Sequence, residues 1–93
     1  MDLMLAVKEK YFREIESGCK KWEYRLQNEY WEKRLVCRNY ERVIITLGYP
    51  KADDTTRRII FPWRGVKKLN EFTHEHFGGN PVAVYAIRLE RRK

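Results

Sequence analysis

Cysteine is scarce in this sequence, and long hydrophobic runs are absent. Its 93 residues include two cysteines, Cys19 and Cys37, too few and too far from any paired motif for a disulfide scaffold or a zinc site. The unbroken apolar stretches are only a few residues long, which excludes a transmembrane helix. The first residues, Met1–Met4, lack the charged segment and the small-residue cleavage site of a signal peptide. We therefore expect a cytoplasmic protein that does not associate with a membrane.

Hydrophobic and aromatic residues occur in the proportions of a folded domain. They make up 43% and 14% of the chain, and a length of 93 residues allows one domain, 1–93, with a thin core. No internal repeat or low-complexity stretch occurs. The formal net charge is +7, but Arg91, Arg92 and Lys93 form a basic tail that contributes three of these charges. The remaining mild excess favours a phosphate-bearing partner.

Local patterns predict two helices and six strands. Tyr11, Phe12 and Ile15 form the apolar stripe of an amphipathic helix, which Gly18 should end in a left-handed cap. Asn28 is a suitable N-cap for a second short helix. The expected helices are 8–17 and 29–36, and the expected strands are 3–7, 22–26, 42–47, 56–61, 65–72 and 82–89.

Three of the strands have distinctive apolar patterns. Trp22, Tyr24 and Leu26 alternate with charged residues, which predicts a half-buried strand. The runs 42–47 and 82–89 are apolar on both faces, so each should be a central strand. Together the elements predict an α+β fold, a small closed or half-closed mixed β-barrel of about six strands with two short helices. Closure would also remove exposed edge strands.

The segment from Ser17 to Arg25 is the most informative part of the chain for function. It predicts a helix end, a turn that contains Lys20, and a strand with Glu23 and Arg25 on one face. An ammonium, a carboxylate and a guanidinium that converge there could hold a polar, planar ligand. If partly buried, Lys20 and Glu23 would also perturb each other's pKa, as acid–base sites require. The alternative is that these charges are simply the solvated face of a strand.

Gly18, Lys20, Glu23 and Arg25 form a Gly-x-Lys-x-x-Glu-x-Arg pattern that resembles the signature of the ASCH (activating signal cointegrator homology) family, part of the PUA-like superfamily of small barrels. The resemblance extends over almost the whole chain. The opening strand and the helix 8–15 resemble the start of the family's domain, and the later hydrophobic strand that ends in 48–49 also matches. The closing segments, 74–78 and 82–87, resemble those of stand-alone bacterial and phage-type members.

The resemblance implies a PUA-like fold and an RNA-binding cleft. ASCH domains are predicted to bind RNA between the barrel and the first helix, with the motif residues lining the cleft. By this resemblance Lys20, Glu23 and Arg25 would be cleft residues, and Gly18 would shape the turn. The first functional hypothesis is therefore a binding domain whose partner is RNA or a modified nucleoside or nucleotide.

Some members of the family are described as amidohydrolases that act on N4-acetylcytidine with a Lys, a Thr and a downstream Glu, and another is described as a ribonuclease. Lys20 matches the Lys position, but Glu23 stands where those enzymes have Thr. Glu71 or Glu75 could be the downstream carboxylate. The second hypothesis is a small hydrolase in which Lys20 and Glu23 are the catalytic acid–base pair and Arg25 orients the substrate. A third is a protein-interaction module whose basic tail docks on an acidic partner.

The remaining candidate ligand-binding residues are aromatic, basic or histidine side chains. Tyr49 should be exposed and could stack a base, as could Trp31 and Trp63 unless they belong to the core. His74 could be a hydrogen-bonding or acid–base group at the edge of the cleft. His74 and His76 share a face without an evident third ligand, so no metal or other cofactor is predicted. The following cations could contact phosphate or form ordinary solvated faces: Lys33, Arg34, Arg57, Arg58 and Arg64.

Overall fold

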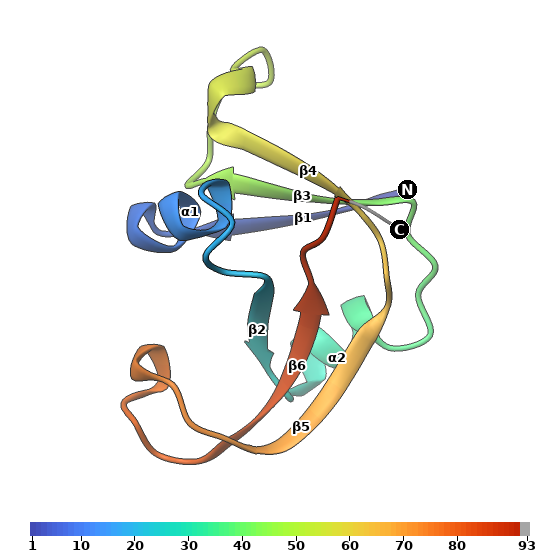
Figure 1. Ribbon diagram of the computed structural model, residues 1–93. Coiled ribbons are helices and arrows are strands. Elements are labelled where there is room, and N and C mark those ends of the chain that lie inside the picture. The colour runs from blue at the N-terminus through green and yellow to red at the C-terminus, as the bar shows by residue number, and fades with distance from the viewer. Residues whose placement is uncertain (92–93) are drawn as a thin grey trace. The chain divides into compact units, whose positions relative to one another are not determined.

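The chain forms six strands and two α-helices in the computed structural model, which describes residues 1–91 apart from the side chain of His76 (Figure 1). Arg92 and Lys93 of the predicted basic tail lie outside the described residues. The predicted α+β class, with six strands and two helices, is confirmed. In chain order the elements are β1 (Asp2–Val7), α1 (Glu9–Glu16), β2 (Trp22–Leu26), α2 (Glu29–Leu35), β3 (Arg42–Leu47), the 3₁₀ turn η1 (Thr55–Arg57), β4 (Arg58–Pro62), β5 (Val66–Phe72), the 3₁₀ turn η2 (Glu75–Phe77) and β6 (Val82–Arg88).

The six strands pair as two three-stranded sheets, in the orders β1-β3-β4 and β2-β6-β5. The central strands are β3 and β6, as their apolar residues on both faces predict. Each sheet ends in two outer strands, and no closed barrel is found among the described residues, so the expected closed barrel is corrected. Alternating apolar residues show that a strand is buried, but they do not specify its hydrogen-bonding neighbours.

Contacts along the chain define two compact units, each built on one sheet. Unit 1 consists of Met1–Lys21, Asn39–Trp63 and the segment that begins at Leu89, and it contains β1, β3, β4 and α1. Unit 2 consists of Trp22–Arg38 and Arg64–Arg88, and it contains β2, β5, β6 and α2.

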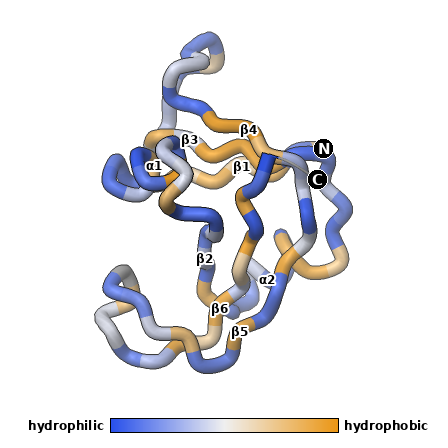
Figure 2. The backbone as a smooth tube through the Cα atoms, viewed as in Figure 1, coloured by the Kyte–Doolittle hydropathy of each residue, from blue (hydrophilic) through white to orange (hydrophobic). Residues whose placement is uncertain are grey.

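The core of unit 1 lies on one face of its sheet. β1 runs parallel to β3, which is antiparallel to β4, and this register places the odd-numbered residues of all three strands on a common face. Figure 2 shows hydrophobic residues concentrated along these strands. The buried side chains on this face are Leu3, Leu5, Val43, Ile45, Ile59 and Phe61, and α1, which contacts β3, adds Phe12 and Ile15.

Helix α1 ends where the sequence predicts. Gly18 has a φ of +86°, the left-handed conformation that glycine adopts without strain, and its N–H donates to the carbonyl of Ile15. The backbone N–H of Lys20 then donates to the carbonyl of Glu14 at 3.0 Å. These bonds fold the turn back against the last part of the helix and hold Lys20 beside it.

The fourth strand begins later than expected. The sequence suggests a strand over 56–61, but Thr55–Arg57 form a 3₁₀ turn and β4 starts at Arg58. Asp54 causes this difference, because its Oδ1 accepts from both the backbone N–H and the hydroxyl of Thr56. Such local hydrogen bonds compete with extended structure.

In unit 2, β6 is antiparallel to both of its neighbours and supplies the buried centre of the sheet. The outer strand β5 carries several exposed charges and has a register shift between Leu69 and Phe72, features that oppose pairing with another chain. Helix α2 begins as predicted, because Asn28 Oδ1 accepts a hydrogen bond from the backbone N–H of Trp31. Leu35 is the buried residue of this helix.

Candidate functional site

The structure divides the predicted ligand-binding residues between the two units. Gly18, Lys20, Tyr49 and Trp63 belong to unit 1, whereas Glu23, Arg25, Trp31 and His74 belong to unit 2. Within unit 2 it brings Glu23, Arg25 and Trp31 together. The convergence of Lys20 with Glu23 and Arg25 stays a prediction.

Glu23 and Arg25 form an ion pair on one face of β2. The Nη2 of Arg25 donates to Oε2 of Glu23 at 2.7 Å, and the two side chains are 20% and 10% exposed, respectively. Their cross-strand neighbours on β6 are Tyr85 and Ile87, both buried. The alternation of β2 is therefore as expected, but the most buried residue of the strand is the carboxylate and not one of its aromatic residues.

Trp31 covers the guanidinium of Arg25. The Cζ atom of Arg25 lies 5.0 Å from the centroid of the Trp31 ring, within cation–π distance. Tyr30 packs edge-on against the same indole at 5.0 Å. Arg25 thus lies between a carboxylate and an aromatic ring, both of which restrict the direction of its donors.

Gln27 fixes the junction between β2 and α2, and sequence analysis overlooked it. Its Nε2 donates to the carbonyls of Val84 at 2.9 Å and Leu69 at 3.3 Å, and its backbone N–H donates to the carbonyl of Ala83. One side chain therefore ties the end of β2 to both other strands of the sheet. No local pattern reveals this role, because the partners lie more than forty residues away in the sequence.

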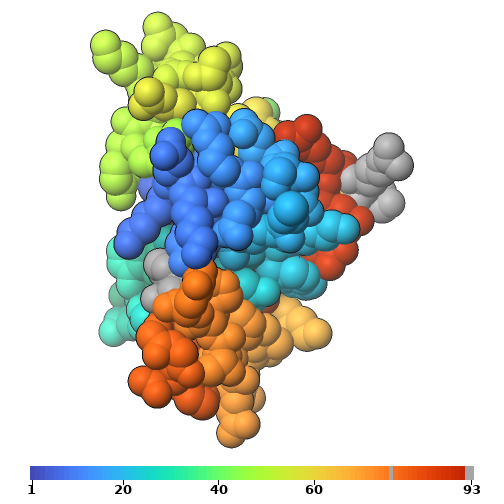
Figure 3. Space-filling view, turned by 60° about the vertical axis from the view of Figure 1, so that its left-hand side comes forward, coloured from blue at the N-terminus to red at the C-terminus, as the bar shows by residue number. Residues whose placement is uncertain are grey.

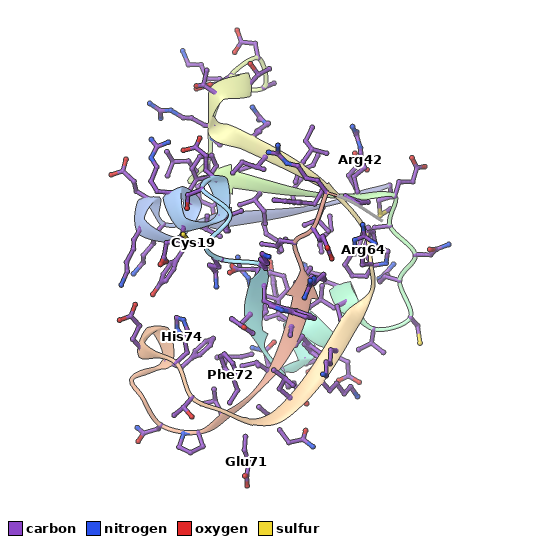
Figure 4. The ribbon with its side chains drawn as sticks, in the orientation of Figure 1. Cys19, Arg42, Arg64, Glu71, Phe72 and His74 are labelled. Atoms are coloured by element: carbon purple, nitrogen blue, oxygen red, sulfur yellow. The ribbon has the colours of Figure 1, made fainter. Side chains whose placement is uncertain are left out.

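Tyr24 points to the opposite face of β2 and joins an aromatic cluster with Phe72 and His74. Its ring centroid lies 4.2 Å from that of Phe72 and 6.0 Å from that of His74, and His74 lies nearly parallel to Phe72, at 11° (Figure 4). Burial, assisted by the negative charge of Glu23, raises the pKa of Tyr24. The Tyr24 hydroxyl therefore keeps its proton to a higher pH than an exposed tyrosine does. The predicted role of His74 at a ligand stays a prediction, but its ring anchors the loop after β5.

Lys20 lies beside an aromatic residue of α1. Its Nζ is 5.6 Å from the ring centroid of Tyr11, and the Nζ of Lys10 is 5.7 Å from the same centroid. Sequence analysis assigned Tyr11 to an apolar stripe. The structure shows a half-buried ring flanked by two ammonium groups, which makes Tyr11 a further candidate for ligand contact.

The two other aromatic candidates of unit 1 differ in exposure. Trp63 is half-buried and packs edge-on against Tyr40 at 5.1 Å, so packing accounts for its position. Tyr49 is 96% exposed, and its predicted exposure is confirmed.

Several cations suggested as phosphate contacts have partners within the protein. Arg58 donates to backbone carbonyls of the preceding loop, and Arg57 pairs with Asp54. Lys33 pairs with Glu29 at 3.2 Å. The guanidinium of Arg34 stacks on Tyr30, its Cζ 3.5 Å from the ring centroid. These contacts stabilise the helices, turns and loops in which the side chains and their partners lie.

Cys19 and Cys37 are free and exposed. Among the side chains that the structure describes, no group of three or more His, Cys, Asp or Glu residues could hold a metal ion. Within residues 1–91, no helix is both long and apolar enough to cross a membrane.

Comparison of the chain with family models, with curated proteins and with solved structures found no match. What the chain does must therefore be inferred from its own residues.

Proposed function

We propose that this chain is a binding domain of the ASCH, PUA-like type that recognises RNA or a modified nucleoside through its Gly-x-Lys-x-x-Glu-x-Arg motif. The observation that carries the proposal is the arrangement of Glu23, Arg25 and Trp31. A guanidinium, a carboxylate and an indole are held together at the junction of β2 and α2, with the charged groups largely removed from water.

This arrangement suits a planar ligand with hydrogen-bonding edges. Arg25 has five N–H donors in a rigid plane, and Glu23, whose Oε2 accepts a hydrogen bond from Arg25, is a carboxylate with acceptor oxygens only. A nucleobase offers complementary donors and acceptors on its edge and a π face for stacking. Trp31 lies within cation–π distance of Arg25 and so already interacts with a planar cation.

The position of Lys20 in the chain, close to Glu23, supports a role for Lys20 in ligand binding. Lys20 precedes Glu23 by three residues, so their Cα atoms are no more than about 11 Å apart in any conformation of the chain. Within unit 1, Tyr11 lies beside Lys20. Gly18, with its positive φ, directs the chain into this turn.

The free, exposed thiols of Cys19 and Cys37 accord with a reducing, cytoplasmic setting. The hydrolase alternative would need Lys20 and Glu23 to exchange protons, while Glu23 already accepts a hydrogen bond from Arg25. No feature of the described residues favours it over binding, and it stays a prediction.

The test compares the effect of replacing Arg25 with the effect of replacing a matched arginine, Arg88. Arg88 lies over Trp22 at 5.0 Å, the same separation as Arg25 and Trp31, in the same sheet. Titration calorimetry with modified nucleosides and fluorescence anisotropy with labelled RNA measure Kd for both variants. Because a hydrogen bond to a charged group contributes about 1.5–3 kcal/mol, Arg25→Ala should raise Kd by about 10- to 150-fold.

Arg88→Ala should leave Kd within about twofold of wild type, and the melting temperatures of both variants show whether the fold is retained. Equal Kd values for wild type and Arg25→Ala, or an equal loss in both arginine variants, would contradict the proposal.

A further inference from the structure

The loop between β3 and β4, residues 48–57, is held in one conformation by Arg58. The Nη1 of Arg58 donates to the carbonyls of Lys51 at 2.7 Å and Asp54 at 2.6 Å, and its Nη2 reaches the carbonyl of Pro50 at 3.4 Å. Arg58 itself is anchored as the first residue of β4, paired with Thr46 of β3. A single side chain thus ties three peptide groups of the loop to the sheet.

Further hydrogen bonds fix both ends of this β3–β4 loop. At its start, the N–H of Gly48 donates to the carbonyl of Val7, and the hydroxyl of Thr46 donates to the carbonyl of Gly48 at 2.7 Å. At its end, Asp54 accepts two hydrogen bonds from Thr56. The loop extends beyond the ends of β3 and β4, and its yellow-green surface projects from unit 1 (Figures 1 and 3).

Tyr49 is placed in solvent by this ordered loop. Its side chain is 96% exposed, although burial of an aromatic side chain of this size is worth about 1.5–3 kcal/mol. The neighbouring backbone is already ordered, so a ligand that contacts Tyr49 has little loop entropy left to overcome. An aromatic ring on a rigid projection is preorganised for binding.

We propose that Tyr49 stacks a base of single-stranded RNA, and that Arg58 is the positioning residue that holds the loop for it. The inference rests on the proposed function and narrows its ligand to an oligonucleotide, one base of which Tyr49 stacks. The loop carries Lys51 and Arg57 against Asp53 and Asp54, and Arg57 pairs with Asp54, so its charges cancel and the proposed contact is stacking on the Tyr49 ring.

The geometry fits a base better than a protein partner. Protein hot spots lie in packed patches where surrounding contacts exclude water. A ring that is 96% exposed has almost no such surroundings on its own chain. A base needs only one face of the ring, and stacking of this kind contributes about 1–3 kcal/mol per base.

The experiment measures Kd by fluorescence anisotropy for a short labelled single-stranded RNA, and by calorimetry for free nucleosides. Tyr49→Ala should weaken RNA binding by about 5- to 150-fold, whereas Tyr49→Phe, which keeps the ring, should bind like wild type. The affinity for free nucleosides should be unchanged in both variants. The slope of log K against log salt should also be unchanged, because no phosphate contact is lost.

A double-mutant cycle tests the positioning role of Arg58. Arg58→Lys keeps the charge but cannot reach three carbonyls, so it should weaken RNA binding in the wild-type background and have no further effect in Tyr49→Ala. Additive losses, or a shallower salt slope in Arg58→Lys, would show that Arg58 contacts phosphate directly and would overturn that role.

The outcomes separate the two proposals. If Arg25→Ala loses RNA binding while Tyr49→Ala binds like wild type, the stacking inference is overturned and the proposed function stands. If the unmodified chain binds neither RNA nor any nucleoside, both are overturned.

Discussion

At the level of single residues, Glu23 and Arg25 lie on the same face of β2 with side chains that are only 10% and 20% exposed. An ion pair removed from water to this extent loses hydration energy comparable with its mutual attraction, so it adds little net stability. Apolar residues of similar size would pack against Tyr85 and Ile87 of β6 at least as well. The pair therefore contributes little to folding, as its role in the proposed function requires.

Backbone conformation at two residues gives opposite predictions for stability. Cys37 is exposed and has a φ of +56°, a conformation that costs a non-glycine residue about 1–2 kcal/mol. We expect Cys37→Gly to stabilise the chain by up to about 1 kcal/mol, the gain being reduced by the greater freedom of glycine when unfolded. Gly18→Ala should destabilise it by about 1 kcal/mol through conformation alone, since an added Cβ at Gly18 meets nothing within 4 Å.

Urea unfolding measures both free energies, with Cys37→Ser as the control that keeps the positive φ. A loss of stability in Cys37→Gly, or none in Gly18→Ala, would show that packing and not backbone strain dominates at these positions.

Sequence placed the motif residues on the right elements but could not predict their burial. The alternation of β2 correctly put Glu23 and Arg25 on one face, since the period of two is a property of any strand. The choice of buried face depends on Tyr85 and Ile87, which join β2 only in the folded sheet. The role of Gln27 was not predicted for the same reason, because the carbonyls it binds join β2 only in the folded sheet.

At the level of elements, α2 depends on its first residue for both stability and position. Asn28 accepts the N–H of Trp31, so Asn28→Ala should cost about 0.5–2 kcal/mol of unfolding free energy. Because the same bond sets the first turn that carries Trp31, the variant should also weaken ligand binding. Asn28→Asp retains a capping oxygen and should remain close to wild type in both respects.

Thermal unfolding and the nucleoside titration measure these two effects. Full stability in Asn28→Ala, or an equal loss in Asn28→Asp, would mean that the cap does not hold the helix.

Element boundaries were predicted well where a local interaction sets them. Gly18 and Asn28 act on neighbouring peptide groups, and the ends of α1 and α2 lie within one or two residues of expectation. The predicted start of β4 was wrong because the hydrogen bonds that Asp54 accepts from Thr56 were not predicted, although they are also local. The apolar residues that follow Thr56 are typical of a strand, and this pattern led to a predicted start that was too early.

At the level of the whole molecule, strand pairing was beyond what the sequence could predict. The parallel pairing of β1 with β3 joins segments about forty residues apart, and β2 pairs with β6 across about sixty. Hydrophobic patterning identified β3 and β6 as central because centrality requires two buried faces. Hydrophobic patterning did not identify the strands next to β3 and β6. For this reason a single barrel was predicted where the chain forms two three-stranded sheets.

Ionisable groups link the stability of the whole molecule to pH at both ends of the scale. The hydrogen bond from Arg42 lowers the pKa of Asp2, and the hydrogen bond from the hydroxyl of Thr56 lowers the pKa of Asp54. Burial, followed by a nearby negative charge, raises the pKa of Tyr24. The first two shifts concern acid stability and the third concerns alkaline stability.

A lowered Asp pKa stabilises the folded chain above the ordinary value of about 3.9, and this contribution disappears as the pH falls through the lowered pKa. A raised Tyr pKa stabilises it below about 10, and this contribution disappears as the pH rises through the raised pKa. We expect these groups to lower the unfolding free energy at both ends of the pH scale, only slightly in acid because Asp2 and Asp54 are screened by solvent. Urea unfolding across pH should show a smaller alkaline decline in Tyr24→Phe than in wild type, whereas Tyr49→Phe, which removes a hydroxyl in open solvent, should retain the full decline. An alkaline decline that is identical in Tyr24→Phe and wild type would show that ionisation of Tyr24 is not linked to folding.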